Sequence, residues 1–214
     1  MAKSLKMKAI GFVFALLPFA SVAAPVIVNG GFEADPYTGE YSPNPTITGW
    51  TKVGSDGTYP LGINNAGGLG PTPYGSQFVV MGLYGRGGGG LTQTVSGFDV
   101  GSTYTLNFAI SSEDTGNARL QVGFDSGSST ASAIFLAPAS YLWHTWQDMS
   151  YNFVATSASV AFRFSDIRSL NGGYDIGLDH VSLTGGTTSV PEPASLALVA
   201  LGLVGLGLSR RRQA

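Results

Sequence analysis

The sequence predicts an all-β fold, a two-sheet antiparallel sandwich, and three observations carry this prediction. Of its 214 residues 31 are Gly and 11 are Pro, without a Gly-X-Y period, which is typical of a turn-rich β domain. Several segments alternate apolar and polar residues with period two. No window of the central region repeats apolar residues with the 3.6-residue period of a helix. The chain has no Cys, which excludes a disulfide scaffold and thiol chemistry.

The clearest alternating segment is 103–110, where every second residue is large and apolar: Tyr104, Leu106, Phe108 and Ile110. The same pattern predicts strands at 120–124, 149–153 and 160–164, and at Gln77–Met81, Gly90–Val95 and the last strand, 178–183. Turn clusters such as Asp125-Ser126-Gly127 separate these runs. Residues 35–73 show little periodicity, so they are predicted to form long loops at one end of the sandwich.

The two ends of the chain differ from the central region. Three lysines within Met1–Lys8 precede an apolar run, Ala9–Ala20, and then small residues up to Ala24, which is the pattern of a secretory signal peptide. Cleavage after Ala23 is favoured over cleavage after Ala24, because the latter would leave Pro25 directly behind the cut. A signal peptide is therefore predicted at 1–23, and the exported domain begins at residue 24.

The C-terminal end combines Pro191-Glu192-Pro193, an apolar segment at 194–208 and the basic triplet Arg210, Arg211 and Arg212. Fifteen helical residues span about 22 Å, less than the ~30 Å of a bilayer core, so the segment predicts a short or transient transmembrane helix. The arginines that follow orient the C-terminus to the cytoplasm.

This order of elements resembles the PEP-CTERM sorting tail of Gram-negative bacteria. The resemblance implies recognition by an exosortase, which would remove the tail at 189–214 and leave the protein in the envelope, at the cell surface or in an extracellular matrix, after transient inner-membrane anchoring. It also implies association with species that make exopolysaccharide. An ordinary tail anchor is the alternative interpretation.

The central region is acidic. Residues 24–190 contain five basic and twelve acidic residues, which leaves a net charge of −7, although the whole chain carries only −2. The five cations are scattered along the sequence. A surface of this kind offers no counterpart to a phosphate backbone, so nucleic acid is excluded as a partner.

A series of short motifs runs through the central region in a recognisable order. They are Val28-Asn29-Gly30-Gly31-Phe32-Glu33, Gly49-Trp50, Gln77-Phe78-Val79-Val80, Leu91-Thr92-Gln93-Thr94-Val95, Trp146 before Tyr151-Asn152-Phe153, and Leu178-Asp179-His180-Val181-Ser182-Leu183. Together they resemble the galactose-binding-like jelly rolls of many carbohydrate-binding modules. The resemblance implies that residues 24–188 form one jelly-roll β-sandwich.

In such modules a Gly-x-Phe-Glu segment and a late Asp hold a structural calcium. Here the resemblance implies Glu33, Asp179 and the carbonyl of Gly31 as ligands. Residue parity along the last strand predicts that Asp179 shares a face with Val181 and Leu183 and points to the sandwich edge, where an unpaired carboxylate is costly. Calcium prefers such oxygen ligands. Solvated loop carboxylates are the alternative.

Candidate sugar-binding residues are less specific. Tyr141 and Trp143 belong to an aromatic cluster, and flat rings of this kind stack on the apolar faces of sugars. Within the cluster, Trp146 is expected in the core, as its counterpart is in the resembling modules, and Trp143 is the candidate for the surface. A partly buried Trp143 is the alternative. Tyr84 and Arg86 complete the predicted set, with Tyr74 among other loop tyrosines and Arg119 as a further donor.

No catalytic motif is found. The two histidines, His144 and His180, lack metal-site spacing, and no serine lies in a Gly-x-Ser-x-Gly turn. Glu113-Asp114 is more typical of a solvated turn than of a glycosidase carboxylate pair. The leading hypothesis is therefore a non-enzymatic, exported surface or matrix protein that contacts exopolysaccharide or cell-surface glycan. The alternatives are a small secreted glycan hydrolase and a structural envelope protein without ligand.

Overall fold

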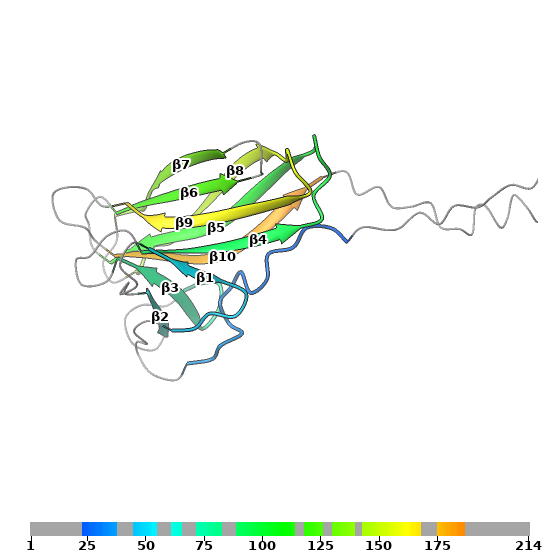
Figure 1. The fold of residues 1–214 in the computed structure, drawn as a ribbon. Helices are drawn as coiled ribbons and strands as arrows, with labels where there is room; N and C mark the ends of the chain where they lie inside the picture. Colours follow the sequence, from blue (N-terminus) through cyan, green and yellow to red (C-terminus); the bar gives the residue numbers. More distant parts are fainter. Residues whose placement is uncertain are drawn as a thin grey trace, which may run out of the picture. The chain divides into compact units, whose positions relative to one another are not determined.

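The structure, a computed structural model, describes residues 23–37, 45–54, 61–65, 72–82, 89–113, 118–125, 130–139, 143–167 and 175–186, all within the compact unit Ala23–Thr188. The predicted tail at 189–214, and the predicted signal peptide except Ala23, lie outside these ranges. In the described ranges the chain forms ten strands and no helix (Figure 1). Accordingly, no described helix is long and apolar enough to cross a membrane.

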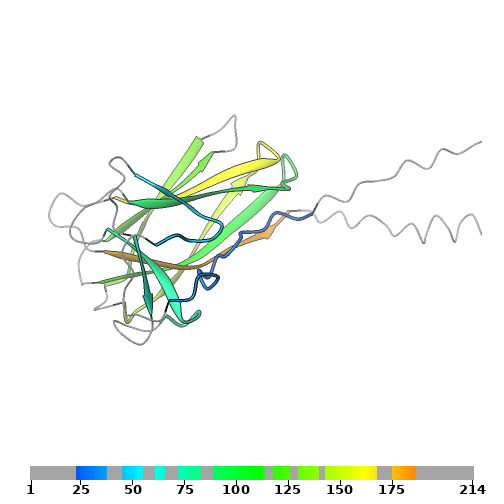
Figure 2. The same cartoon turned by 60° about the horizontal axis from the view of Figure 1, so that its bottom comes forward.

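The strands form two antiparallel five-stranded sheets that face each other (Figures 1 and 2). The first sheet has the order β1-β4-β9-β6-β7, with β1 Thr51–Val53, β4 Gly90–Ser96, β9 Ser159–Asp166, β6 Arg119–Asp125 and β7 Thr130–Leu136. The second has the order β2-β3-β10-β5-β8, with β2 Leu61–Asn65, β3 Gln77–Met81, β10 Ile176–Gly185, β5 Thr103–Ser112 and β8 Gln147–Val154. Non-consecutive neighbours such as β4 and β9 show that the chain crosses between the sheets, and the fold is the predicted two-sheet jelly-roll β-sandwich.

The core lies between the sheets and is filled by the residues that the alternation assigned to it. Leu106, Phe108 and Ile110 of β5 are at most 1% exposed, and Leu120 and Val122 of β6 are fully buried. Aromatic rings from both sheets interdigitate, as where Phe108 meets Phe164 edge to face at 5.6 Å. Burial of these side chains is the main force that holds the two layers together.

Three strands were not predicted. β1 and β2 lie inside the region 35–73, which the sequence predicted to be loops, and β1 is only three residues long. β7 is an edge strand whose residues are apolar on both faces, with Ile134 and Leu136 more than half exposed, so it lacks the alternation that marks a half-buried strand.

The N-terminal segment is held to the first sheet by one buried side chain. Gln93 of β4 is 6% exposed. Its carbonyl oxygen accepts from the amide of Val28 at 2.8 Å, and its amide nitrogen donates to the carbonyls of Val28 at 2.9 Å and Gly49 at 2.7 Å. The Gln93 side chain thus makes the hydrogen bonds that a neighbouring strand would otherwise make to this irregular backbone.

Candidate functional site

A tight turn at 29–33 brings the Gly-Gly-Phe-Glu segment against the last strand. Asn29 and Phe32 have positive φ of 52° and 58°. The Asn29 side-chain oxygen accepts from the amide of Ala34 at 3.0 Å, which stabilises the left-handed conformation locally. Phe32 is fully buried, so the residue that follows, Glu33, is fixed at the base of the turn.

The Glu33 carboxylate is held by the segment that leads into β3. Its Oε1 accepts from the amides of Ser76 at 2.7 Å and Gln77 at 2.9 Å, and its Oε2 accepts from the Ser76 hydroxyl at 3.0 Å. Backbone donors of this kind orient a carboxylate without neutralising its charge.

A β-bulge in β10 decides where Asp179 points. Asp179 pairs with Ala109 of β5, whereas Ser182 pairs with Asn107, so one extra residue lies between them. His180 takes up the irregularity with a φ of 53°. The amide of Val181 then donates to the Gly30 carbonyl at 2.9 Å instead of to the ladder.

The expectation that Asp179 shares a face with Val181 and Leu183 is therefore wrong. Leu183 pairs with Leu106, a core residue, whereas Asp179 pairs with Ala109, which lies on the opposite, outer face of the second sheet. The bulge shifts the alternation by one residue, and simple parity cannot anticipate such a shift.

Asp179 is nevertheless fully buried, because the segment around Thr72 covers it. Its Oδ2 accepts from the Thr72 hydroxyl at 2.5 Å and its Oδ1 from the amide of His180 at 2.6 Å. Burial raises the pKa of Asp179, the two hydrogen bonds oppose the rise, the charge of Glu33 adds to it, and the net result is a pKa of about 6.

The residues around Asp179 carry oxygen ligands of the types that bind a hard cation. Glu33 is near enough to Asp179 to repel its charge, and neither carboxylate has an ion pair with any described residue. The Gly31 carbonyl, which lies in the same turn as Glu33, has no hydrogen-bond donor among the described residues. Carboxylate and backbone carbonyl oxygens are what calcium prefers. No group of three or more Asp, Glu, His or Cys meets in the described part of the chain, so carbonyl or hydroxyl oxygens would have to complete the set.

A second feature lies on the outer face of the first sheet. It is a trough of about 340 Å³. At its centre Arg163 of β9 lies between Thr92 of β4 and Gly123 of β6 in the sheet register. The lining also includes Val53, Asp125 and Ala161.

The Arg163 side chain is exposed and only partly engaged. Its Nε donates to the Ser165 hydroxyl at 2.9 Å, and its two terminal nitrogens have no partner among the described residues. Gly123 leaves the floor of the trough open, although a Cβ there would meet the Arg163 Cβ at an ordinary 3.7 Å. Neither packing nor backbone conformation thus requires glycine at position 123. A glycine inside a strand often marks a place where a ligand approaches the backbone closely.

The predicted sugar-binding residues have a mixed outcome. Trp143 is 1% exposed, so it is not a surface ring for sugar stacking, and the alternative of a buried Trp143 holds. Its ring packs at 5.8 Å from Phe78 in a small apolar cluster on the outer face of the second sheet. Trp146, which was expected in the core, is the partly exposed member of that cluster. Tyr141, Tyr84 and Arg86 lie outside the described residues.

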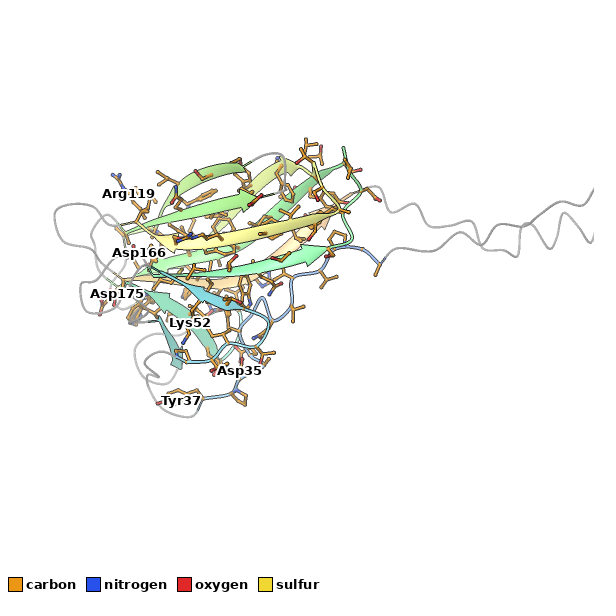
Figure 3. All side chains as sticks on the ribbon, in the orientation of Figure 1. Asp35, Tyr37, Lys52, Arg119, Asp166 and Asp175 are labelled. Atoms are coloured by element: carbon orange, nitrogen blue, oxygen red, sulfur yellow. The ribbon has the colours of Figure 1, made fainter. Side chains whose placement is uncertain are left out.

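Buried acids occur at one end of the sandwich, where Figure 3 labels Asp166, Asp175 and Arg119. Asp166 and Asp175 are 2% and 4% exposed, and the Asp175 carbonyl accepts from the amide of Glu113 at 3.1 Å. Sequence reasoning missed these two aspartates because each lies at a strand end next to a glycine-rich loop. Asp114, the partner suggested for Glu113, is outside the described residues.

Solved structures share this architecture. TmCBM61, solved in complex with beta-1,4-galactotriose, superposes with a TM-score of 0.52 at 17% identity, over 74% of this chain and 96% of that one. Arabinose-bound MgGH51 α-L-arabinofuranosidase gives 0.51 at 16% identity, over 76% of this chain but 26% of that chain. The enzymatically active domain of bacteriophage CBA120 tailspike protein 4 gives 0.51 at 16% identity, over 75% and 21%. The chain thus shares its jelly-roll fold with TmCBM61, and in the two enzymes only about a quarter or less of the chain corresponds to it.

The sequence match concerns the other end of the chain. Residues 189–212 match the PEP-CTERM protein-sorting motif, which includes the predicted Pro191-Glu192-Pro193 and the arginine triplet. The motif indicates an exported protein sorted to the cell envelope. No curated protein matches the sequence.

Proposed function

We propose that the protein is a non-enzymatic module of the cell surface or extracellular matrix that binds polysaccharide across the outer face of its first sheet. The observation that carries the proposal is the trough around Arg163, where a guanidinium with unengaged nitrogens lies beside an open glycine position. The sorting motif and the jelly-roll architecture support the same function.

The trough suits an extended glycan chain. Guanidinium nitrogens donate to sugar hydroxyls or to a uronate carboxylate, and the Asp125 carboxylate in the same lining accepts from hydroxyls. Thr92 and Ala161 have small side chains, so the surface is shallow there and an extended polymer can lie across several strands. These groups bind and orient a glycan, and nothing in the lining resembles a pair of catalytic carboxylates.

Calcium is proposed as a structural ion. Glu33, Asp179 and the Gly31 carbonyl would hold it, and when bound it would compensate the charge of two neighbouring carboxylates. Since Glu33 belongs to the first turn and Asp179 to the last strand, the ion would link the two ends of the domain. Such a link stabilises the native state only.

The tail is proposed as an exosortase substrate. The body would pass the inner membrane, remain transiently anchored by residues 194–208 and be released near Pro191-Glu192-Pro193 to the envelope, where exopolysaccharide is the expected partner. Intact-mass measurement on protein from the native envelope should find residues 194–214 missing. Retention of the arginine triplet at steady state would instead support an ordinary tail anchor.

Glycan binding is tested with the full chain in a detergent that contains no sugar. The probes are β-1,4-galactotriose, neutral galactan and polygalacturonate, scored by calorimetry and by release of reducing ends. Arg163→Gln should weaken binding about tenfold or more, since a charge-assisted hydrogen bond contributes about 1.5–3 kcal/mol. Gly123→Ala should weaken binding while leaving stability equal or slightly higher, because a Cβ fits there and Gly is unfavourable in a strand.

Asp99→Asn, at an exposed position outside the trough, is the matched control. Binding that is unaffected by both trough variants would refute the site. Release of reducing ends would favour the hydrolase alternative, and absence of binding to all probes and to the native exopolysaccharide would favour a structural protein without ligand.

A further inference from the structure

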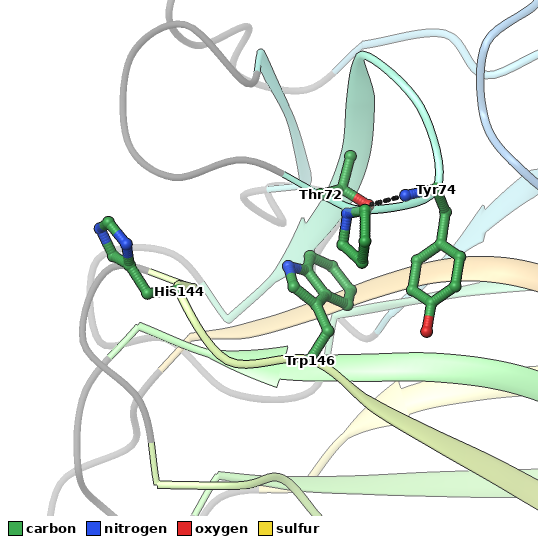
Figure 4. Close-up of a pocket in the computed structure, with 5 residues that line it drawn as sticks. Thr72, Tyr74, His144 and Trp146 are labelled. Carbon is green, nitrogen blue, oxygen red and sulfur yellow. Dashed lines mark hydrogen bonds between the residues drawn. The ribbon is translucent and has the colours of Figure 1, made fainter.

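An aromatic hollow lies on the outer face of the second sheet (Figure 4). It has a volume of about 300 Å³ and is lined by Thr72, Pro73, Tyr74, His144 and Trp146. The first three residues precede β3 and the last two precede β8, so the segments leading into these strands meet above β10. Its size is at the lower end of the range of about 300–1,000 Å³ for small-ligand pockets.

The benzo end of the Trp146 indole lies against the sheet. A Cβ added to Gly177 of β10 would lie 3.1 Å from Cη2 of Trp146. Phe78 and Tyr74 pack against the ring in edge-to-face contacts, at interplanar angles of 81° and 84°. Trp146 is therefore a rigid, partly exposed ring with its orientation already determined.

Polar groups surround this ring. The Tyr74 hydroxyl donates to Oδ1 of Asp148 at 2.5 Å, and the Tyr74 ring stacks on His180 at 4.7 Å. The second oxygen of Asp148 has no partner among the described residues. The same holds for the imidazole of His144, which is exposed at the rim. Donors and acceptors are thus available next to a fixed aromatic face.

We propose that this hollow is a second carbohydrate site, which takes one neutral sugar residue. A sugar ring presents an apolar face of C–H groups that stacks on an aromatic ring, with hydroxyls at its edge that both donate and accept. The rim carries a carboxylate and no described Lys or Arg lines it, so it selects against anionic sugars. The proposal extends the proposed function, but it depends on different residues.

The two sites lie on opposite faces of one sandwich. The trough is on the outer face of the first sheet, and the hollow covers the outer face of the second. A single domain that binds sugars on both faces can bridge two polysaccharide chains, and the effective concentration of the second site strengthens each attachment. The expected role is therefore that of a monomeric cross-linker within a matrix.

Fluorescence quenching provides a direct test. The chain has three tryptophans, of which Trp50 and Trp143 are 7% and 1% exposed, so acrylamide reaches Trp146 preferentially. In the full chain in sugar-free detergent, β-1,4-galactotriose and galactan oligomers should reduce quenching by about half or more at saturation. Arg163→Gln should leave this protection unchanged, whereas His144→Ala should raise the ligand concentration required about 2- to 10-fold, as expected for one hydrogen bond. His144 is exposed and unpartnered among the described residues, so this variant is expected to fold normally.

Bridging is scored by light scattering from long-chain galactan mixed with the protein. The wild type should raise the scattering strongly, and either His144→Ala or Arg163→Gln should give less scattering at the same protein and galactan concentrations. Quenching that no sugar probe changes, in a protein that still binds galactan through the trough, would overturn the second site and leave the proposed function standing. Protection that survives in His144→Ala but is lost in Arg163→Gln would also overturn it. If the sugars still protect Trp146 and both trough variants bind galactan as well as the wild type, the trough is refuted and the second site stands.

Discussion

The buried carboxylate of Asp179 should make the metal-free protein less stable at neutral pH than at acid pH. Burial raises the pKa of Asp179 from 3.8 to about 6 in the folded state. Between these two values the folded protein binds a proton that the unfolded chain releases, so the free energy of unfolding falls as the pH rises. The stabilisation is complete below about pH 3.8 and is lost as the pH rises through about 6.

The size of the effect follows from the shift. About two pKa units at 1.36 kcal/mol each correspond to a loss of about 3 kcal/mol between pH 4 and pH 7. Asp179→Asn removes the charge and this loss. An amide can accept only one of the two hydrogen bonds that Thr72 and His180 donate, which costs about 1 kcal/mol. The variant should therefore be less stable than the wild type by about 1 kcal/mol at pH 4 and more stable by about 2 kcal/mol at pH 7.5.

Urea denaturation of residues 23–188 in excess chelator, from pH 4 to pH 8, measures both curves. Other groups titrate in both proteins, so the difference between the curves isolates Asp179. The curves should cross between pH 4 and pH 7, and Asp99→Asn should follow the wild type throughout. Parallel curves for the wild type and Asp179→Asn would refute the reasoning.

Calcium should make the wild type more stable than Asp179→Asn at neutral pH, the reverse of the order in chelator. At 100 times its dissociation constant calcium adds about 2.7 kcal/mol to the stability of a protein that binds it only when folded. The wild type should gain this amount, with a rise in Tm of several degrees, and Asp179→Asn should gain none. A wild type whose Tm is the same in chelator and in millimolar calcium would mean that Glu33 and Asp179 do not hold the ion.

Four further variants probe the contacts of Gly30, Gln93 and Tyr74. A Cβ at Gly30 would overlap the Val181 carbonyl oxygen, so Gly30→Ala should lose about 3 kcal/mol or more in urea denaturation, and a loss below 1 kcal/mol would contradict the close approach. Gln93→Leu leaves two carbonyls and one amide of the N-terminal segment and its neighbour without partners, so it should lose about 2–3 kcal/mol and speed amide exchange before residue 30; normal protection there would argue against the tether. Burial, and then the hydrogen bond and charge of Asp148, raise the pKa of Tyr74 to about 12, so the ultraviolet difference between wild type and Tyr74→Phe should appear only above about pH 11 and move to lower pH in Asp148→Ala.

Local alternation was sufficient for the central strands. Over 104–110 of β5, 120–124 of β6 and 160–164 of β9 every second residue is a large apolar one and is buried, so the sequence alone determined which of these side chains fill the core. The tail was also readable from the sequence, because its signature is a linear order of motif, apolar segment and arginines. Both signals are contained within short stretches of chain.

The site residues depended on the tertiary structure. Glu33 and Asp179 were named from sequence motifs, but the direction of Asp179 was decided by a bulge at His180, which exists because Val181 bonds to the Gly30 carbonyl 151 positions away in the chain. A contact over that distance leaves no trace in the local alternation of β10. The sequence therefore identified the carboxylates, and only the packed structure showed which face of the sheet they occupy.

The exchange of roles between Trp143 and Trp146 has the same cause. The segment that contains them has no periodicity that could assign one face to the core. Both rings reach Gly177, where the missing side chain leaves room for them, but Trp143 is 1% exposed whereas Trp146 remains partly exposed at the edge of the hollow beside Tyr74. Burial outside regular strands is determined by whatever distant segment covers the residue, and only the tertiary fold brings that segment into contact.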